Sequence, residues 1–195
     1  GGPGGGLGRR GYVRALDPER FRIIGFDQRG CGRSVPLAHE PAHDLASNTT
    51  ARLIADAEAL RAHLGVETWV LNGVSWGSTL ALAYATEHPG RVLGVVLMAV
   101  TTTRRWEVDW ITEGVGALYP EAWAAFASNA EAAGIGFRRG EGRIVDAYAR
   151  LGGHPDPAAR DAACRAWAAW AATHLSTASG GSAAGSAPDP RWSAR

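Results

Sequence analysis

Three short apolar runs in the first half of the chain predict buried strands, and two amphipathic stretches predict helices. The strand runs cover residues 21–26, 69–74 and 92–100. Leucine and alanine recur at helical spacing over residues 53–64, and a second helical pattern covers residues 79–88, before Pro89. Continuous apolar strands that alternate with helices are typical of a parallel sheet covered on both faces. The pattern therefore predicts an α/β, doubly wound fold.

The pattern changes after Thr101, where strand-like runs end and helical periodicity takes over. Three helical segments, separated by glycine or proline, cover roughly residues 120–133, 141–151 and 156–174. Proline near the start of a segment fits a helix N-terminus. We therefore expect a core over residues 1–103 and a helical part over residues 104–175. Residues 176–195, rich in Ser, Gly and Ala, are expected to form a disordered or frameshifted tail.

The composition narrows the class of protein. The 195 residues include 20 Lys and Arg against 19 Asp and Glu, a formal net charge of +1, and 46% are hydrophobic. This is typical of a globular protein with a sizeable core and gives no electrostatic reason to expect a nucleic-acid partner. No apolar run approaches the roughly 18 to 20 residues of a membrane span, and no leader is recognised, so no membrane partner is expected. Cys31 and Cys164 lie in unlike contexts, which predicts neither a disulfide framework nor a zinc cluster and favours a reducing, cytoplasmic location.

The strongest chemical signal is a five-residue motif between the second predicted strand and the helix after it. The motif reads Gly73-Val74-Ser75-Trp76-Gly77. In a nucleophile elbow, a serine occupies a sharp, strained turn from strand to helix, and small residues two positions on either side let the backbones approach. Such a pentapeptide also arises by chance in a glycine-rich chain, but the strand–turn–helix setting favours the elbow. We therefore predict Ser75 as a catalytic nucleophile.

A serine nucleophile needs backbone N–H donors for the oxyanion of its tetrahedral intermediate. One donor is the N–H of the following residue, Trp76, and the other comes from a loop after an earlier strand. The glycine-rich opening of the chain is a candidate for that loop, with Gly1 or Gly2 as the donor. Such a run on its own is more often a linker. A phosphate-binding loop is disfavoured, because no Gly-Lys-Ser/Thr follows.

Several segments together resemble the prolyl aminopeptidase (proline iminopeptidase) branch of the α/β-hydrolases. In chain order they are residues 1–6 (GGPGGG), 27–34 (DQRGCGRS), 48–50 (NTT), 76–84 (WGSTLALAY), 88–89 (HP) and 104–110 (RRWEVDW). The loop at 27–34 and the start of the last segment are the most specific to this branch. The resemblance implies an α/β-hydrolase fold with a helical cap, a serine exopeptidase that releases N-terminal proline from peptides, Ser75 as nucleophile, and no metal or organic cofactor.

The sequence also departs from that family. In this superfamily the catalytic order is serine, acid, histidine, with the last two on loops beyond the cap, so we expect neither the triad acid nor the triad histidine in this chain. The acids and histidines of the cap are interpreted as surface residues: Asp109, Asp146, Asp156, Asp161, His154 and His174. Ala171 stands where the family tends to have a glutamate that meets the substrate's α-amino group. The strand that usually precedes the glycine-rich loop is missing too, and we expect a chain truncated at both ends.

The residues of the substrate pocket are a further prediction. Trp106 and Trp110, at i and i+4, share one helix face and are the best candidates for an apolar pocket that takes a pyrrolidine ring. The other cap tryptophans are interpreted as packing residues. Cys31 either lies near the entrance of the site or is a passive buried thiol.

Three functional hypotheses stay open at this point. The first is a prolyl aminopeptidase whose partners are peptides with N-terminal proline. The second is another α/β-hydrolase, an esterase, amidase or epoxide hydrolase, because the fold hosts many chemistries. The third is a catalytically dead fragment without the triad acid and histidine, whose unpaired sheet edge predicts poor solubility. The sequence does not predict an oligomeric state.

Overall fold

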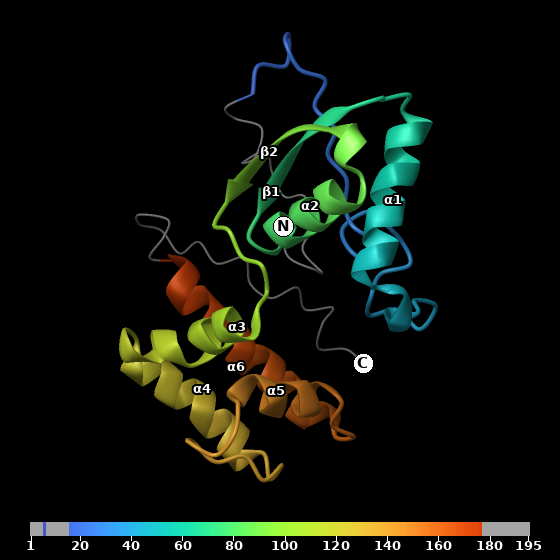
Figure 1. The fold of residues 1–195 in the computed structure, drawn as a ribbon. Coiled ribbons are helices and arrows are strands. Elements are labelled where there is room, and N and C mark those ends of the chain that lie inside the picture. Colours follow the sequence, from blue (N-terminus) through green and yellow to red (C-terminus); the bar gives the residue numbers. More distant parts are fainter. Residues whose placement is uncertain (1–5, 7–15, 177–195) are drawn as a thin grey trace. The chain divides into compact units, whose positions relative to one another are not determined.

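The computed structural model describes Gly6 and residues 16–176, and it divides the chain into two compact units. Unit 1 comprises residues 1–103, and unit 2 comprises residues 104–195. Figure 1 shows that, in the described part of the chain, the two strands of the sheet belong to unit 1, whereas unit 2 is built from helices.

Unit 1 is built on two parallel strands, β1 (Trp69–Val74) and β2 (Val92–Met98). Parallel strands need a crossover connection, and helix α2 (Trp76–Glu87) with the short 3₁₀ turn η3 (Pro89–Arg91) supplies it. Helix α1 (Thr50–His63) precedes β1 and packs beside α2 (Figure 1). Together these elements confirm the predicted alternation of parallel strands and helices.

Helices α1 and α2 cover one face of the strand pair. A cluster of buried and partly buried residues joins helices to strands: Ile54, Ala57, Leu71, Tyr84 and Val92. Side chains alternate between the two faces of a strand. Val70 and Val96 occupy the alternate positions and are exposed. The continuous apolar runs thus give the sheet two apolar faces, and α1 and α2 cover one of them.

A polar network ties α1 to α2 beside that cluster. The Glu58 carboxylate accepts hydrogen bonds from Arg61 Nε at 2.8 Å and Nη2 at 3.0 Å, and from the Tyr84 hydroxyl. The Arg61 hydrogen bonds are the main reason that the pKa of Glu58 is held at about 2. Desolvation is the main reason that the pKa of Tyr84 is raised to about 12.

The predicted strand at residues 21–26 is wrong. Residues 21–28 have no regular secondary structure, and both Phe21 and Ile23 are exposed. An apolar run becomes a strand only when a neighbouring strand takes up its N–H and C=O groups. Within the described residues the one sheet is the β1–β2 pair, which does not include this run. The third predicted strand also ends two residues early, at Met98.

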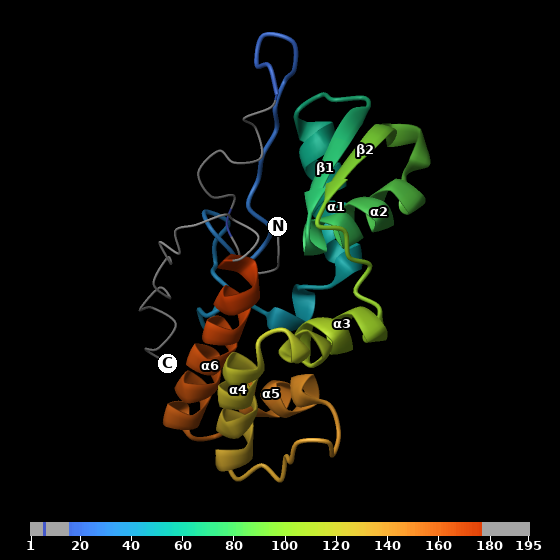
Figure 2. The ribbon, with the colours of Figure 1, turned by 90° about the vertical axis from the view of Figure 1, so that its left-hand side faces the viewer.

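The described residues of unit 2 form four α-helices: α3 (Arg105–Thr112), α4 (Pro120–Ala132), α5 (Ile144–Gly152) and α6 (Pro157–Ser176). The last three confirm the predicted helical segments to within three residues. Proline is the first residue of α4 and of α6, as expected for a residue without an N–H to donate. Figure 2 shows α4 and α6 side by side.

The core of unit 2 is aromatic. Phe126 of α4 is buried and stacks on Tyr148 of α5 at 4.2 Å between ring centroids and on Trp170 of α6 at 5.6 Å. Ile144 and Leu151 of α5 are fully buried beside them. Apolar side chains at helical spacing therefore hold three helices around one core.

Candidate active site

Ser75 lies between the last residue of β1 and the first residue of α2, and its backbone is strained. Its φ is 55° and its ψ is −127°, a conformation rarely adopted by residues other than glycine. A backbone held there costs about 1–3 kcal/mol and persists only where the surroundings impose it. The side chain is exposed. The turn therefore presents a serine hydroxyl to solvent at the carboxyl end of a strand, as a nucleophile elbow does.

Glycine makes this turn sterically possible. A Cβ on Gly73 would lie 2.5 Å from the carbonyl oxygen of Gly77 and 3.0 Å from the Cα of Ser78. The strand and the first turn of α2 are thus closer than any side chain allows. Gly77 itself is buried in the same contact. This close approach explains why the residues two positions before and after Ser75 are both glycine.

Ser78 holds the turn in place through hydrogen bonds of its buried hydroxyl. Its hydroxyl is fully buried, lies in hydrogen-bond contact with the Ser75 carbonyl and accepts the N–H of Thr101 at 2.9 Å. Thr79 donates its hydroxyl to the Thr101 carbonyl at 2.8 Å. The Ser75 N–H donates to Met98 at the end of β2 at 3.0 Å. The serine backbone is therefore tied both to its own helix and to the loop after β2.

Of the two predicted oxyanion donors, the structure describes only the Trp76 N–H. Trp76 opens α2, and the first N–H groups of a helix have no acceptor within the helix and lie at its positive end. Its N–H is thus suited to an anion that forms on the substrate. Gly1 and Gly2 lie outside the described residues. Gly6, at the end of the same run, lies against the loop at 27–34, because a Cβ there would be 3.3 Å from the Cα of Gly32.

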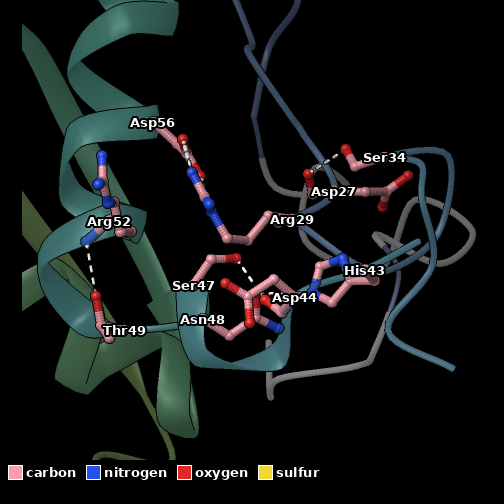
Figure 3. Close-up of polar contacts among 10 residues, drawn as sticks. All are labelled: Asp27, Arg29, Ser34, His43, Asp44, Ser47, Asn48, Thr49, Arg52 and Asp56. Atoms are coloured by element: carbon pink, nitrogen blue, oxygen red, sulfur yellow. Dashed lines mark hydrogen bonds and ion pairs between the residues drawn. The ribbon is translucent and has the colours of Figure 1, made fainter. Parts of the chain in front are cut away.

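Internal hydrogen bonds and two ion pairs, Arg29–Asp56 and Arg33–Asp27, hold the loop at residues 27–34. Asp27 Oδ2 accepts the N–H of Arg33 at 3.0 Å, and the Ser34 hydroxyl donates to the Asp27 carbonyl at 2.7 Å. Arg29 donates two hydrogen bonds to the Asp56 carboxylate on α1, from Nε at 2.7 Å and from Nη2 at 2.5 Å. Figure 3 shows Arg29 reaching from the loop towards Asp56 on α1. The loop therefore has a fixed position on unit 1.

Cys31 of this loop is a buried thiol. It is 3% exposed, and its Sγ donates to the Gln28 carbonyl at 3.1 Å. Both the exposure and the bond fit a residue that closes the turn. Of the two readings left open by the sequence, this geometry favours the passive one.

His43 has a structural role that sequence reasoning missed. Its Nδ1 lies 3.0 Å from the Pro36 carbonyl and its Nε2 lies 3.0 Å from Asn48 Oδ1 (Figure 3). Both ring nitrogens are engaged in bracing the segment between residues 36 and 48. Among the described residues, no histidine forms a hydrogen bond with Ser75. A general base for Ser75 is therefore not assembled in the described part of the chain.

Trp106 and Trp110 lie on α3 in unit 2 and line a hollow of about 430 Å³. They are 64% and 55% exposed, unusual for tryptophan. Asp109, Glu113 and Gly114 complete the lining. A Cβ on Gly114 would lie 2.4 Å from Trp110 Cε3, so this indole rests directly on the backbone. We call this feature the α3 hollow.

Trp123 and Trp170 pack in unit 2 and position α3. The indole N–H of Trp123 donates to the Thr112 carbonyl and that of Trp170 donates to the Ile111 carbonyl, both at 3.1 Å. These bonds supply donors to carbonyls at the end of α3, which have no N–H partner within the helix. The packing interpretation of these residues fits this geometry.

Ionised side chains surround the α3 hollow. Arg143 Nη2 and Arg105 Nε lie 2.6 Å and 3.8 Å from the Asp109 carboxylate, and Arg143 also contacts Asp146 at 3.3 Å. Glu113 Oε1 accepts the N–H of Ile144 at 2.9 Å. The hydrogen bond to Asp109 is the main reason that the pKa of Arg143 is raised. This guanidinium is therefore a permanent cation.

Two further properties concern the described residues alone. No group of three or more His, Cys, Asp or Glu side chains within them is arranged to hold a metal ion. Of the helices they form, none has the length and apolar character needed to cross a membrane.

Comparison with known proteins places this geometry in context. The model of the alpha/beta hydrolase fold family matches residues 1–138. A probable proline iminopeptidase of Streptomyces coelicolor is 46% identical over 169 residues, which cover 85% of this chain and 51% of that protein. Proline iminopeptidases of Arabidopsis thaliana and Neisseria gonorrhoeae are each 44% identical, over 87% of this chain and 42% and 52% of theirs. The chain spans about half the length of the curated relatives it matches.

Proposed function

The chain belongs to the α/β hydrolase fold family, and on that basis we propose that it carries the nucleophile and cap of a proline iminopeptidase. The observation that supports this proposal most strongly is the strained backbone of Ser75 between β1 and α2. Strained residues of this kind cluster at active sites, where the strain is part of the mechanism. The names of relatives that match at 42–46% identity support peptides with N-terminal proline as substrates.

The proposed reaction is acyl transfer through Ser75. A histidine takes the hydroxyl proton as Ser75 Oγ bonds to the carbonyl carbon of the N-terminal proline, and the rest of the peptide then leaves as an amine that takes up that proton. Water hydrolyses the resulting ester and releases free proline. We assign neither this histidine nor its acid partner to a residue of the chain.

The N–H groups of Trp76 and of Gly1 or Gly2 are the proposed oxyanion donors. The N-terminal position of Trp76 on α2 supports the first. Loss of one such donor typically lowers kcat about 10²- to 10³-fold. The exposed indoles of Trp106 and Trp110 are the proposed walls for the pyrrolidine ring. The buried Cys31 thiol is given no contact with substrate in this proposal.

The cytoplasm is the proposed location. Cys31 and Cys164 are free thiols, which supports a reducing compartment. Proteolysis by a serine peptidase of this type needs no redox partner.

Hydrolysis of proline p-nitroanilide by the protein expressed from its complete reading frame tests the proposal. Ser75→Ala is expected to lower kcat/KM at least about 10³-fold with the fold intact, because it removes the atom that forms the ester. Ser47→Ala is the matched control and should retain full activity, because it removes a hydroxyl of the short 3₁₀ helix at residues 45–47 that donates to the Asp44 carbonyl. Full turnover by Ser75→Ala would refute the proposal. Faster cleavage of aryl esters than of proline amides would instead favour an esterase.

A further inference from the structure

Asp27 is a buried carboxylate to which the proposed reaction gives no role. Its side chain is only 6% exposed, although aspartate is almost never fully buried unless it is paired. It forms an ion pair with Arg33, whose Nε lies 3.3 Å away, but the Arg33 side chain is 85% exposed. An ion pair so open to solvent contributes little to stability. The burial of Asp27 therefore needs a further reason.

Glycines from two separate segments make room for this carboxylate. A Cβ on Gly32 would lie 2.4 Å from Asp27 Cγ and 2.5 Å from its Oδ2, so the carboxylate occupies space that only a glycine leaves open. Gly6 belongs to the glycine-rich run at residues 1–6. A Cβ on Gly6 would lie 3.4 Å from Asp27 Oδ1 and 3.3 Å from the Gly32 Cα. The carboxylate thus lies against both the loop at 27–34 and the glycine-rich run.

The loop side of this contact is fixed to unit 1. The Arg33 N–H donates to Asp27 Oδ2 at 3.0 Å. The Ser34 hydroxyl donates to the Asp27 carbonyl at 2.7 Å (Figure 3). Arg29, two positions further along, is bonded to Asp56 of α1. The Asp27 carboxylate is therefore a fixed support for whatever lies against it.

The glycine-rich run needs such a support. Five of its six residues are glycine, which has no side chain to pack and loses more conformational freedom on ordering than any other residue. An oxyanion donor, in contrast, must be preorganised, because a displacement of about 1 Å in an active site can lower the rate about 10²-fold. A contact from outside the run must supply this order, and Asp27 makes such a contact at Gly6.

We propose that Asp27 is a positioning residue for the oxyanion hole. Its carboxylate holds Gly6 beside Gly32 and so anchors the glycine-rich run, which supplies one of the two donors. This inference rests on the proposed function for the role of that run. Because Asp27 acts on the run and not on the substrate, its loss should weaken stabilisation of the transition state and leave substrate binding unchanged.

Kinetics of the protein expressed from its complete reading frame test the inference. Asp27→Ala removes the support, and it should lower kcat for proline p-nitroanilide about 30-fold while KM changes less than about two-fold. Asp27→Asn keeps the shape and an oxygen for the Arg33 N–H, so it should restore most of the lost kcat. Full kcat in Asp27→Ala, or a higher KM with kcat unchanged, would overturn the inference.

Asp44→Ala is the matched control for Asp27→Ala. It removes an exposed carboxylate of unit 1 that also accepts a backbone N–H, from Ala46 at 2.9 Å. The change costs a hydrogen bond of the same kind but leaves the glycine-rich run untouched. Asp44→Ala should therefore retain the kcat of the wild type, and an equal loss of kcat in both variants would overturn the inference.

A boronate probe measures the oxyanion hole separately from stability. Pyrrolidine-2-boronic acid bonds to a serine nucleophile as a tetrahedral anion that resembles the transition state, so its affinity depends on the oxyanion donors. Its Ki should rise in Asp27→Ala by about the factor by which kcat falls, and it should keep the wild-type value in Asp44→Ala. An unchanged Ki in Asp27→Ala would reject the positioning role.

Gly6→Ala makes the test independent of whether Asp27→Ala folds. Gly6 is exposed, and the atoms nearest to the new Cβ belong to Gly32 and Asp27. The Cβ should push the run away from its support, lower kcat about five-fold and raise the boronate Ki by a similar factor, with the thermal unfolding temperature unchanged. Wild-type values of both constants in Gly6→Ala would overturn the inference.

The two proposals fail in different ways. If Ser75→Ala abolishes turnover but Asp27→Ala and Gly6→Ala keep the wild-type kcat and boronate Ki, only the inference about Asp27 is wrong. If Ser75→Ala retains full turnover, the proposed mechanism is wrong, and the inference loses its premise.

Discussion

Backbone geometry defines the elbow in unit 1, whereas side-chain packing defines the α3 hollow in unit 2. At Ser75 the decisive features are a positive φ and a glycine that no other residue can replace. At the hollow they are indole rings and carboxylates held by residues up to 59 positions away, as in the bond from Trp170 to Ile111. A site made of backbone is encoded locally, and a site made of packed side chains depends on the whole unit.

The largest expected effect is on unit 2. Phe126→Ala removes the ring on which Tyr148 and Trp170 stack, and it should lower the free energy of unfolding by about 4 kcal/mol. Hydrogen exchange measured by mass spectrometry should then accelerate in α4, α5 and α6. Leu118→Ala, at an exposed position of the same unit, should have little effect. Equal destabilisation by the two variants would show that the aromatic cluster does not carry the unit.

The corresponding change in unit 1 acts on the backbone. Gly73→Ala places a Cβ 2.5 Å from the Gly77 carbonyl, so β1 and α2 must separate, at a cost of about 3 kcal/mol. Urea unfolding should detect this loss, with exchange accelerated in β1 and α2. At Gly90 a Cβ meets nothing within 4 Å, so Gly90→Ala is the control. A stable Gly73→Ala variant would contradict the close approach that defines the elbow.

The free energy of unfolding of unit 1 should depend on pH through Glu58. The pKa of Glu58 is lowered from 4.5 to about 2 in the folded protein, so its network with Arg61 stabilises unit 1 above about pH 4.5 and loses that contribution as the pH falls towards 2. The loss should be about 2 kcal/mol after allowance for the partial exposure of this side chain. Acid titration of unfolding in the wild type and in Glu58→Gln measures it. Parallel curves for the two proteins would reject the assignment.

The smallest expected effect concerns the brace behind the serine. Ser78→Ala removes the buried hydroxyl that accepts the Thr101 N–H, which should cost about 1.5 kcal/mol. Thr86→Ala removes another hydroxyl from α2, but an exposed one that bonds within the helix, and should cost less. Thermal unfolding compares the two. A larger loss in Thr86→Ala would mean that the brace is not needed.

The same contrast explains which features the sequence predicts. The strand, turn and helix around Ser75 and the helices α4 to α6 follow from local periodicity, glycine and proline. The run at 21–26 has the composition of a strand, but it forms one only if a neighbouring strand pairs with it. The sequence of the run does not show whether such a strand is present. Trp106 and Trp110 are predicted to share one helix face because they lie four residues apart. The bond from Arg143 to Asp109 joins residues 34 positions apart, so local spacing does not predict it.

Chemical labelling of Ser75 tests the central claim most directly. Diisopropyl fluorophosphate reacts with serines that are activated as nucleophiles. In the protein expressed from its complete reading frame, peptide mapping by mass spectrometry should place a single phosphoryl adduct on Ser75, and the Ser75→Ala variant should take up none. An adduct on another serine, or undiminished labelling of Ser75→Ala, would contradict the assignment of this strained turn as the catalytic centre.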